Sequence, residues 1–322
     1  MYHALATLTA TAGTAMWRTH VMLRPAIISL VALVAITSNA SAQTCAGSPV
    51  AVQILGSGGP GINPERASAG YLLWVGPQAK LLIDLGGGGF LRFGQSRAKV
   101  ADLAMLGITH LHPDHTSDIA ALMWGSNRAR SEPLPVAGPS GNGAAPDVAT
   151  FLNRMFDART GAYQVLGSIL GEGQAGAERP RLDISTVDVA RDEPTTVFDR
   201  DGVRVTAVRI PHTLPAVAYR VQTRGVTVVF SSDQNGTNPG FVDFAKGADV
   251  LLMHMAIAAK SPANPGHAAP AVVGRIAHEA GVKRLIVSHI GQYNLDEAVA
   301  ELRASYAGPL TVGADLQCTQ AQ

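Results

Sequence analysis

Residues 109–116 read Thr109-His110-Leu111-His112-Pro113-Asp114-His115-Thr116. The chain has only 10 histidines, and three of them fall in this stretch. Imidazole and carboxylate groups suit zinc and related divalent cations. Alternate side chains of an extended segment point the same way. We therefore expect His110 and His112 to face one cation, and Asp114 and His115 to face a second cation beside it.

The cluster is predicted to lie on a loop between two regular elements, a short apolar strand at Ile108–Leu111 and a helix at Asp118–Asn127. Further strands are predicted at Val50–Leu55, Gly70–Val75, Lys80–Asp84, Leu134–Val136, Val250–Met253 and Leu285–Ser288, with a β-rich stretch over Ile184–Asp233 that contains hairpin turns at Asp201-Gly202 and Arg224-Gly225. Further helices are predicted at Ser96–Leu106, Ala145–Leu170, Pro270–Ala280 and Leu295–Ala304. This order predicts one α/β domain over residues 43–322, with two mixed β-sheets packed face to face and helices on the outer faces.

The N-terminal 42 residues have the organisation of a signal peptide. Arg24 is followed by an apolar run from Ala26 to Ile36 and then by Ser38-Asn39-Ala40-Ser41-Ala42, an A-x-A cleavage site. The run is short of the about 20 residues that span a bilayer. We therefore predict a signal peptide over residues 1–42, with Met22 as an alternative translation start. The expected location is the periplasm or the medium, with no membrane anchor after cleavage.

The charge balance argues against a nucleic-acid partner. The chain carries 25 basic and 24 acidic residues. Cleavage after Ala42 removes Arg18 and Arg24 and no acidic residue, which leaves 23 basic and 24 acidic residues. Such a chain lacks the positive surface that phosphate backbones require. A small anionic substrate is still compatible with it, because bound cations attract anions themselves. A homodimer is compatible with the sequence.

Two cysteines, Cys45 and Cys318, lie near the two ends of the predicted mature chain. An even number of cysteines in an oxidising compartment favours pairing. We predict a disulfide that links the two termini; the alternative is two free thiols.

The motif H-x-H-x-D-H after an apolar strand resembles the metallo-β-lactamase fold superfamily, and the resemblance extends over most of the mature chain. Similar early elements are Leu55-Gly56-Ser57-Gly58 and Leu82-Ile83-Asp84-Leu85-Gly86. Later motifs that match are His212, Ser232-Asp233 and Ser288-His289, each at the end of a predicted strand. Ala218-Tyr219-Arg220 and the segment ending in His254 are similar to the branch that contains ribonuclease Z and exported arylsulfatases.

The resemblance implies a centre with two metal ions, most simply zinc, with manganese or iron as alternatives. One ion takes His110, His112 and His212. The other takes Asp114, His115 and His289, and Asp233 bridges the two ions together with a water or hydroxide. Asp114 then acts in catalysis as well as in binding.

Other residues near the motifs are assigned supporting roles. His254 resembles the histidine that serves the leaving group, so we assign it the proton donor. His267 is expected to line the substrate pocket or to cap the next helix. Asp84 is expected to orient the metal-binding loop. The distal residues also have ordinary alternatives: His212 and Asp233 can cap turns, and His289 can be a buried core histidine.

The expected activity is hydrolysis of a small sulfate or phosphate ester, of the arylsulfatase or phosphodiesterase type, by a bridging hydroxide. Bacterial ribonuclease Z enzymes carry a long tRNA-binding arm between the third histidine and the bridging aspartate. Here only a predicted hairpin separates His212 from Asp233. We expect the extra segment Ala145–Pro180 to cover the pocket; ordinary packing is the alternative. A ribonuclease Z-like endoribonuclease, a lactonase and a metal-holding protein without turnover stay open.

Overall fold

The computed structural model describes residues 45–126, 130–171 and 179–321. By backbone contacts the chain divides into two units, Met1–Asn39 and Ala40–Gln322, and every described residue belongs to the second. The predicted signal peptide lies outside the described residues. Among the described helices, none combines the length and the hydrophobicity needed to cross a membrane.

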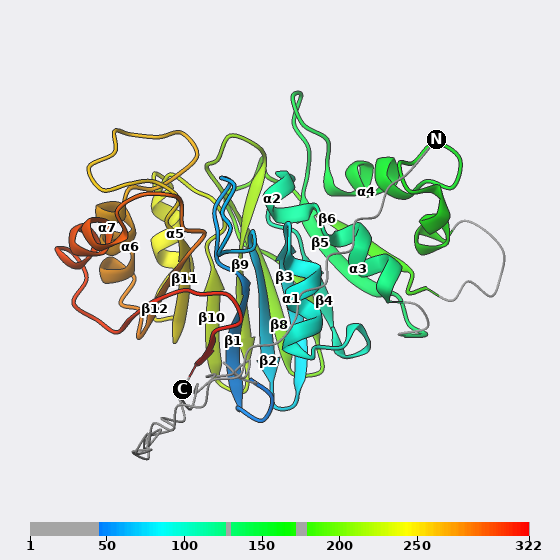
Figure 1. The fold of residues 1–322 in the computed structure, drawn as a ribbon, viewed down its shortest axis with the longest axis horizontal. Coiled ribbons are helices and arrows are strands. Elements are labelled where there is room, and N and C mark those ends of the chain that lie inside the picture. The colour runs from blue at the N-terminus through cyan, green and yellow to red at the C-terminus, as the bar shows by residue number, and fades with distance from the viewer. Residues whose placement is uncertain (1–44, 127–129, 172–178, 322) are drawn as a thin grey trace, which may run out of the picture. The chain divides into compact units, whose positions relative to one another are not determined.

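Two seven-stranded mixed sheets form the centre of the second unit (Figure 1). The first sheet has the strand order β14 (Cys318–Gln320), β1 (Val50–Gly56), β2 (Gly70–Val75), β3 (Gln78–Leu85), β4 (Met105–Gly107), β5 (Leu134–Pro139) and β6 (Leu182–Val187). The second has the order β13 (Leu310–Val312), β12 (Leu285–Ser288), β11 (Val250–His254), β10 (Val226–Phe230), β9 (Ala216–Thr223), β8 (Val203–Ile210) and β7 (Thr195–Arg200). The predicted sandwich of two mixed sheets is confirmed.

Helices cover the outer face of each sheet (Figure 1). The helical elements are α1 (Gly89–Ser96), α2 (Pro113–Thr116), α3 (Ile119–Gly125), α4 (Val148–Phe156), α5 (Pro239–Ala245), α6 (Pro270–Glu279), α7 (Leu295–Arg303) and the 3₁₀ turns η1 (Val100–Asp102) and η2 (Gln164–Leu170). α1, α3 and α4 pack on the first sheet, and α5, α6 and α7 pack on the second.

The alternation of side chains along each strand produces three apolar layers. In β1, Val52 and Ile54 belong to the cluster between the sheets, whereas Ala51 and Leu55 belong to the cluster under the helices. In β10, Phe230 faces the first sheet and Val229 faces the helices of the second. Because both faces of these strands are covered, they are apolar almost throughout.

Three segments differ from their predicted structure. The helix predicted over Ala145–Leu170 is wrong as a single helix, because the backbone leaves the helical conformation at Asp157 (ψ 131°); α4 ends at Phe156 and η2 begins only at Gln164. The predicted helix Ser96–Leu106 is wrong: α1 ends at Ser96, Arg97 has a left-handed backbone (φ 61°), and the chain continues through η1 into β4. The adjoining strand was predicted at Ile108–Leu111 but occupies Met105–Gly107. The chain leaves the strand after Gly107, and the backbone N–H of Thr109 donates to the Asp84 carboxylate.

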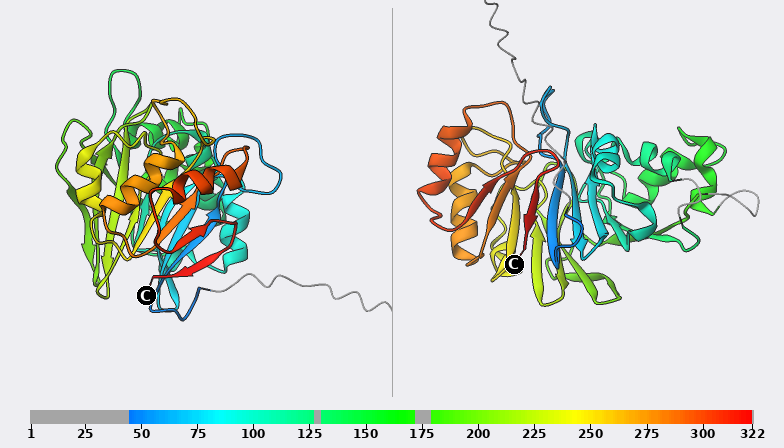
Figure 2. Two further views of the ribbon diagram at one scale, coloured as in Figure 1. Left: turned by 90° about the vertical axis from the view of Figure 1, so that its left-hand side faces the viewer. Right: turned by 60° about the horizontal axis from the view of Figure 1, so that its bottom comes forward.

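The predicted disulfide between Cys45 and Cys318 is formed. Cys318 begins β14, which pairs with β1 along the edge of the first sheet (Figure 2). The bond joins residues 273 positions apart, so it closes a loop that includes nearly the whole domain. A cross-link of this span restricts the unfolded chain strongly.

A thiol titration of the denatured protein should therefore find no free sulfhydryl group. Replacing both cysteines by serine should lower the free energy of unfolding by about 2–5 kcal/mol, measured by urea denaturation. The matched control is the unchanged protein under reducing conditions, which should lose the same stability. Two titratable thiols in the unreduced protein would contradict the structure.

Candidate metal centre

The first group of donors consists of three imidazoles. His110 and His112 lie on the loop between β4 and α2, and His212 lies just after β8. His110 Nε2 is 3.0 Å from His112 Nδ1, and His212 Nε2 is 3.2 Å from the same atom. Three ring nitrogens thus converge on one point from both sheets, in an arrangement that could hold a metal ion.

The second group lies beside the first. His115 Nε2 and His289 Nε2 are 3.1 Å apart, and His289 Nε2 is 3.1 Å from Asp114 Oδ2. Asp114 and His115 come from α2, whereas His289 directly follows β12. His289 has a left-handed backbone (φ 55°), and the neighbouring Ile290 exchanges backbone hydrogen bonds with the loop at Ser57 and Gly59. This loop fixes the turn that aims the His289 ring.

Asp233 lies between the two groups. Its Oδ2 atom is 3.7 Å from His110 Nε2, 3.6 Å from His115 Nε2 and 3.9 Å from His212 Nε2. The structure therefore brings together all seven side chains that the sequence suggested as ligands, and it places one carboxylate oxygen where it can be shared. The donors, which are imidazoles and carboxylates, suit zinc and similar divalent cations.

Neighbouring acceptors fix which nitrogen faces the centre in two of the rings, His115 and His212. Asp84 Oδ2 lies 2.7 Å from His115 Nδ1, so that nitrogen carries the proton and Nε2 points inward. The same carboxylate accepts hydrogen bonds from the N–H and the hydroxyl of Thr109. The carbonyl of Gly266 lies 2.8 Å from His212 Nδ1 and has the same effect there. Nothing in the sequence indicated that the carbonyl of Gly266 would orient His212 or that Thr109 would hydrogen-bond to Asp84.

Burial and charge keep most donors in the protonation state that binds cations. Burial lowers the pKa of His110 well below its usual range and that of His212 to about 4. Burial would raise the pKa of Asp114, but the hydrogen bond and charge of His289 lower it to about 2. His115 differs: burial opposes its protonation, yet the charges of Asp84 and Asp233 raise its pKa. A bound cation would compete with that proton.

His254 is buried behind Asp233. Its Nδ1 lies 2.6 Å from Asp233 Oδ1, and its Nε2 lies 2.9 Å from the Tyr71 hydroxyl. Its ring atoms also lie close enough to the second donor group to count among potential ligands. Because both nitrogens already have partners, the geometry argues against the role of proton donor to a leaving group, which the sequence suggested for His254.

His267 lies at the open side of the centre. Its side chain is 18% exposed, and its Nδ1 is 3.9 Å from Asp233 Oδ2. The ring centroid lies 5.5 Å from that of His212 and 5.8 Å from that of His289, so His267 adjoins both donor groups. It borders a cavity of about 530 Å³ that also contains Asn264 and Arg275. Of the two expectations for His267, the structure matches lining of a pocket.

A second cavity, of about 460 Å³, reaches the other side of the centre at His112 and Asp114. Neither cavity is lined by described residues of the segment 145–180. Phe156, the last residue of α4, is buried. Phe151 and Met155, on the same helix, pack beside it on the outer face of the first sheet. The expectation that this segment covers the pocket is therefore not met by these side chains, because their apolar surface is used in packing.

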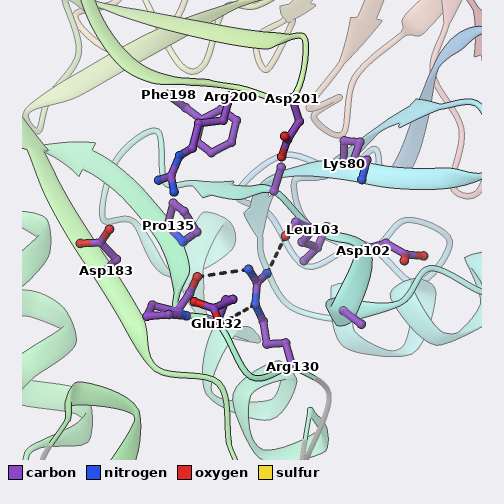
Figure 3. A pocket seen from close by; sticks show the side chains of 13 residues that line it. Lys80, Asp102, Leu103, Arg130, Glu132, Pro135, Asp183, Phe198, Arg200 and Asp201 are labelled. Carbon is purple, nitrogen blue, oxygen red and sulfur yellow. Dashed lines mark hydrogen bonds between the residues drawn. The ribbon is translucent and has the colours of Figure 1, made fainter.

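A third cavity, of about 480 Å³, lies beside the residues that precede β4 and β5, Leu103 and Pro133 among them. Figure 3 shows the side chains that line it. The Arg130 guanidinium is directed at the carbonyls of Leu103, Glu132 and Pro133, which occupy its donors. Cations and carboxylates are mixed along its wall, and none of the metal-site residues reaches it. Arg130 therefore has a structural role here, and none of the described residues that line this cavity belongs to the metal centre.

Comparison with known proteins agrees with the fold and the site. The model of the beta-lactamase superfamily domain matches residues 81–290, which is more than half of the chain, and the chain therefore belongs to this superfamily, whose fold is the metallo-β-lactamase fold. This range contains the residues from Asp84 to His289 that build the centre.

The chain is also similar to particular proteins of known name or structure. A ribonuclease Z of Mycolicibacterium paratuberculosis is 29% identical over 294 residues, which is 84% of this chain and 98% of the relative. A ribonuclease Z of Mycobacterium bovis is 25% identical over 287 residues, with 82% and 96% covered. Among solved structures, the short form of human tRNase Z has a TM-score of 0.66 at 19% identity and covers 84% of this chain and 99% of its own. The protein YhfI of Bacillus subtilis has a TM-score of 0.65 at 21% identity, with the same coverage. These two structures share the fold.

Replacing Asp84 by asparagine should weaken metal binding at the position of His115 by about 10–100-fold, since the partner that orients the ring is lost. Competition with a chromogenic zinc chelator measures this change. Asp249→Asn is the matched control, because Asp249 is also hydrogen-bonded, to Lys283 and Thr227, but far from the donors. Equal affinities for Asp84→Asn and the unchanged protein would contradict the orienting role.

Proposed function

We propose that the protein is a hydrolase with two divalent metal ions that cleaves diesters of phosphoric acid in small molecules. The observation that supports this proposal most strongly is the position of Asp233 Oδ2 between two groups of imidazole and carboxylate donors. The name ribonuclease Z, shared by relatives that match along most of their length, supports a phosphodiester over a sulfate ester.

Seven side chains would hold the two ions. His110, His112 and His212 would hold one ion, Asp114, His115 and His289 the other, and Asp233 both. When bound, the two ions would supply an acidified water and offset negative charge on the phosphoryl oxygens.

His267 is the side chain best placed to give a proton to the leaving oxygen. It is partly exposed at a cavity, whereas His254 is enclosed by Asp233 and Tyr71. Burial lowers the pKa of His267, which makes its protonated form a stronger acid.

Small substrates are favoured over RNA by the surroundings of the centre. β9 and β10 are joined by the two-residue turn Arg224-Gly225, so the chain between His212 and Asp233 is the simple hairpin that the sequence predicts. The cation that lines the 530 Å³ cavity, Arg275, is paired with Glu279 at 2.9 Å. Binding of a polyanion needs several cations that are free to contact phosphates.

An endoribonuclease is the second candidate, because the relative from Mycolicibacterium paratuberculosis bears that name and is covered over 98% of its length. The arylsulfatase activity that the sequence analysis expected, and the lactonase activity that it kept as an alternative, have no such support.

We also infer that the protein works outside the cytoplasm. The pattern of residues 1–42 and the Cys45–Cys318 disulfide support this location, since disulfides persist in oxidising compartments.

A chromogenic panel tests the substrate class. The zinc-loaded protein should cleave bis-nitrophenyl phosphate faster than nitrophenyl sulfate, a nitrophenyl-reporting lactone or a structured RNA with a 3′ extension. Chelation should abolish the activity, zinc should restore it, and Asp233→Ala should lower it by about 100-fold or more. Asp243→Ala, which changes an exposed aspartate on α5, is the control.

Each other result has a defined meaning. Activity that persists after complete metal removal would contradict a metal-dependent mechanism. Fastest turnover of the RNA would favour the second candidate, and fastest turnover of the sulfate would return the function to an arylsulfatase.

The proton donor is tested with leaving groups of different basicity. His267→Ala should reduce kcat by about 10²–10⁴-fold for a diester with an alkoxide leaving group, and far less for nitrophenolate, which leaves without a proton. His278→Ala, an exposed histidine on α6, should change neither rate. An equal loss with both leaving groups would argue against proton donation by His267.

A further inference from the structure

Asp233 uses its two oxygens differently. Oδ2 faces the donor groups, at 3.6–3.9 Å from His115, His110 and His212. Oδ1 lies 2.6 Å from His254 Nδ1. His289 Nδ1 is the other nitrogen near Oδ1, at 3.5 Å. The short contact to His254 therefore determines how the carboxylate is turned.

This contact fixes the tautomer of His254. A carboxylate can only accept hydrogen bonds, so the proton at the 2.6 Å contact belongs to Nδ1. The Nε2 atom of the neutral ring is then an acceptor, and it needs a donor. The Tyr71 hydroxyl, at 2.9 Å, is the donor that meets it.

Contacts with both sheets fix the position of the Tyr71 side chain. It belongs to β2 in the first sheet, whereas His254 ends β11 in the second, so the hydrogen bond crosses between the sheets. Its oxygen also lies 3.2 Å from Ser288 Oγ, and its ring packs 6.1 Å from that of Phe230. Tyr71, His254 and Asp233 are at most 5% exposed. Water cannot readily replace a missing partner at such a depth.

We propose that Tyr71 is a positioning residue of the metal centre: its hydroxyl holds His254 as the Nδ1–H tautomer, and His254 in turn holds Asp233 with Oδ2 directed at both metal positions. The proposal rests on the proposed dinuclear function and adds to it a residue that lies outside every motif of the sequence. Tyr71 is linked to Asp233 through this chain of two hydrogen bonds.

Tyr71→Phe removes the hydroxyl and keeps the ring. It should weaken zinc binding by about 10–100-fold, measured by chelator competition, and should alter the visible spectrum of the cobalt-substituted protein. Tyr306→Phe is the matched control, since Tyr306 is also buried but its hydroxyl donates to the carbonyls of Val282 and Pro309, which are not part of the centre. The control should retain the affinity and the spectrum.

Two substitutions of His254 test the same claim without changing Tyr71. The amide nitrogen of asparagine can occupy the place of Nδ1 and donate to Asp233, whereas that of glutamine reaches the place of Nε2. His254→Asn should therefore bind zinc more tightly than His254→Gln. In the His254→Asn background, Tyr71→Phe should cause little further loss, because the amide needs no tautomer to be chosen.

The outcomes separate the two levels of the proposal. Unchanged affinity and spectrum in Tyr71→Phe, or tighter binding by His254→Gln than by His254→Asn, would overturn the positioning role. Failure of the unchanged protein to bind two ions would instead overturn the proposed function.

Discussion

The carboxylate of Asp233 is 2% exposed and has six histidines within 4 Å. A buried charge is costly unless it is paired and hydrogen-bonded, and here the partners are rings that must themselves be held in one tautomer. Asp84 orients His115, the carbonyl of Gly266 orients His212, and Tyr71 contacts His254. The charges and hydrogen bonds around Asp233 thus make sense together as the surroundings of shared cations.

The sandwich brings these groups together because both sheets direct strand ends to the same edge. The first sheet supplies the segment with His110, His112, Asp114 and His115. The second supplies His212, Asp233 and His289, which follow β8, β10 and β12. Three non-glycine residues around the centre have left-handed backbones: Asp84 (φ 56°), Ser232 (φ 57°) and His289 (φ 55°). Such conformations are uncommon away from glycine and tend to persist where function requires them.

Much of this could be predicted from the sequence, since its signals are local. Short apolar runs located β1 and β2, and alternation of apolar residues located the hairpins. The turns Asp201-Gly202 and Arg224-Gly225 have the left-handed backbones that such turns need. The end of α1 could not be predicted, because Arg97 adopts a left-handed conformation that nothing in its neighbours indicates. The role of His254 depends on Tyr71, which is 183 positions away along the chain. Contacts of this kind are set by the packing of two sheets and leave no periodicity to detect.

The most direct test of the account is an anomalous difference map from crystals of the zinc-loaded protein, recorded at the zinc absorption edge. The account predicts two peaks on either side of Asp233 Oδ2, one among His110, His112 and His212 and the other among Asp114, His115 and His289. A single peak, or a second ion bound away from Asp233, would contradict it.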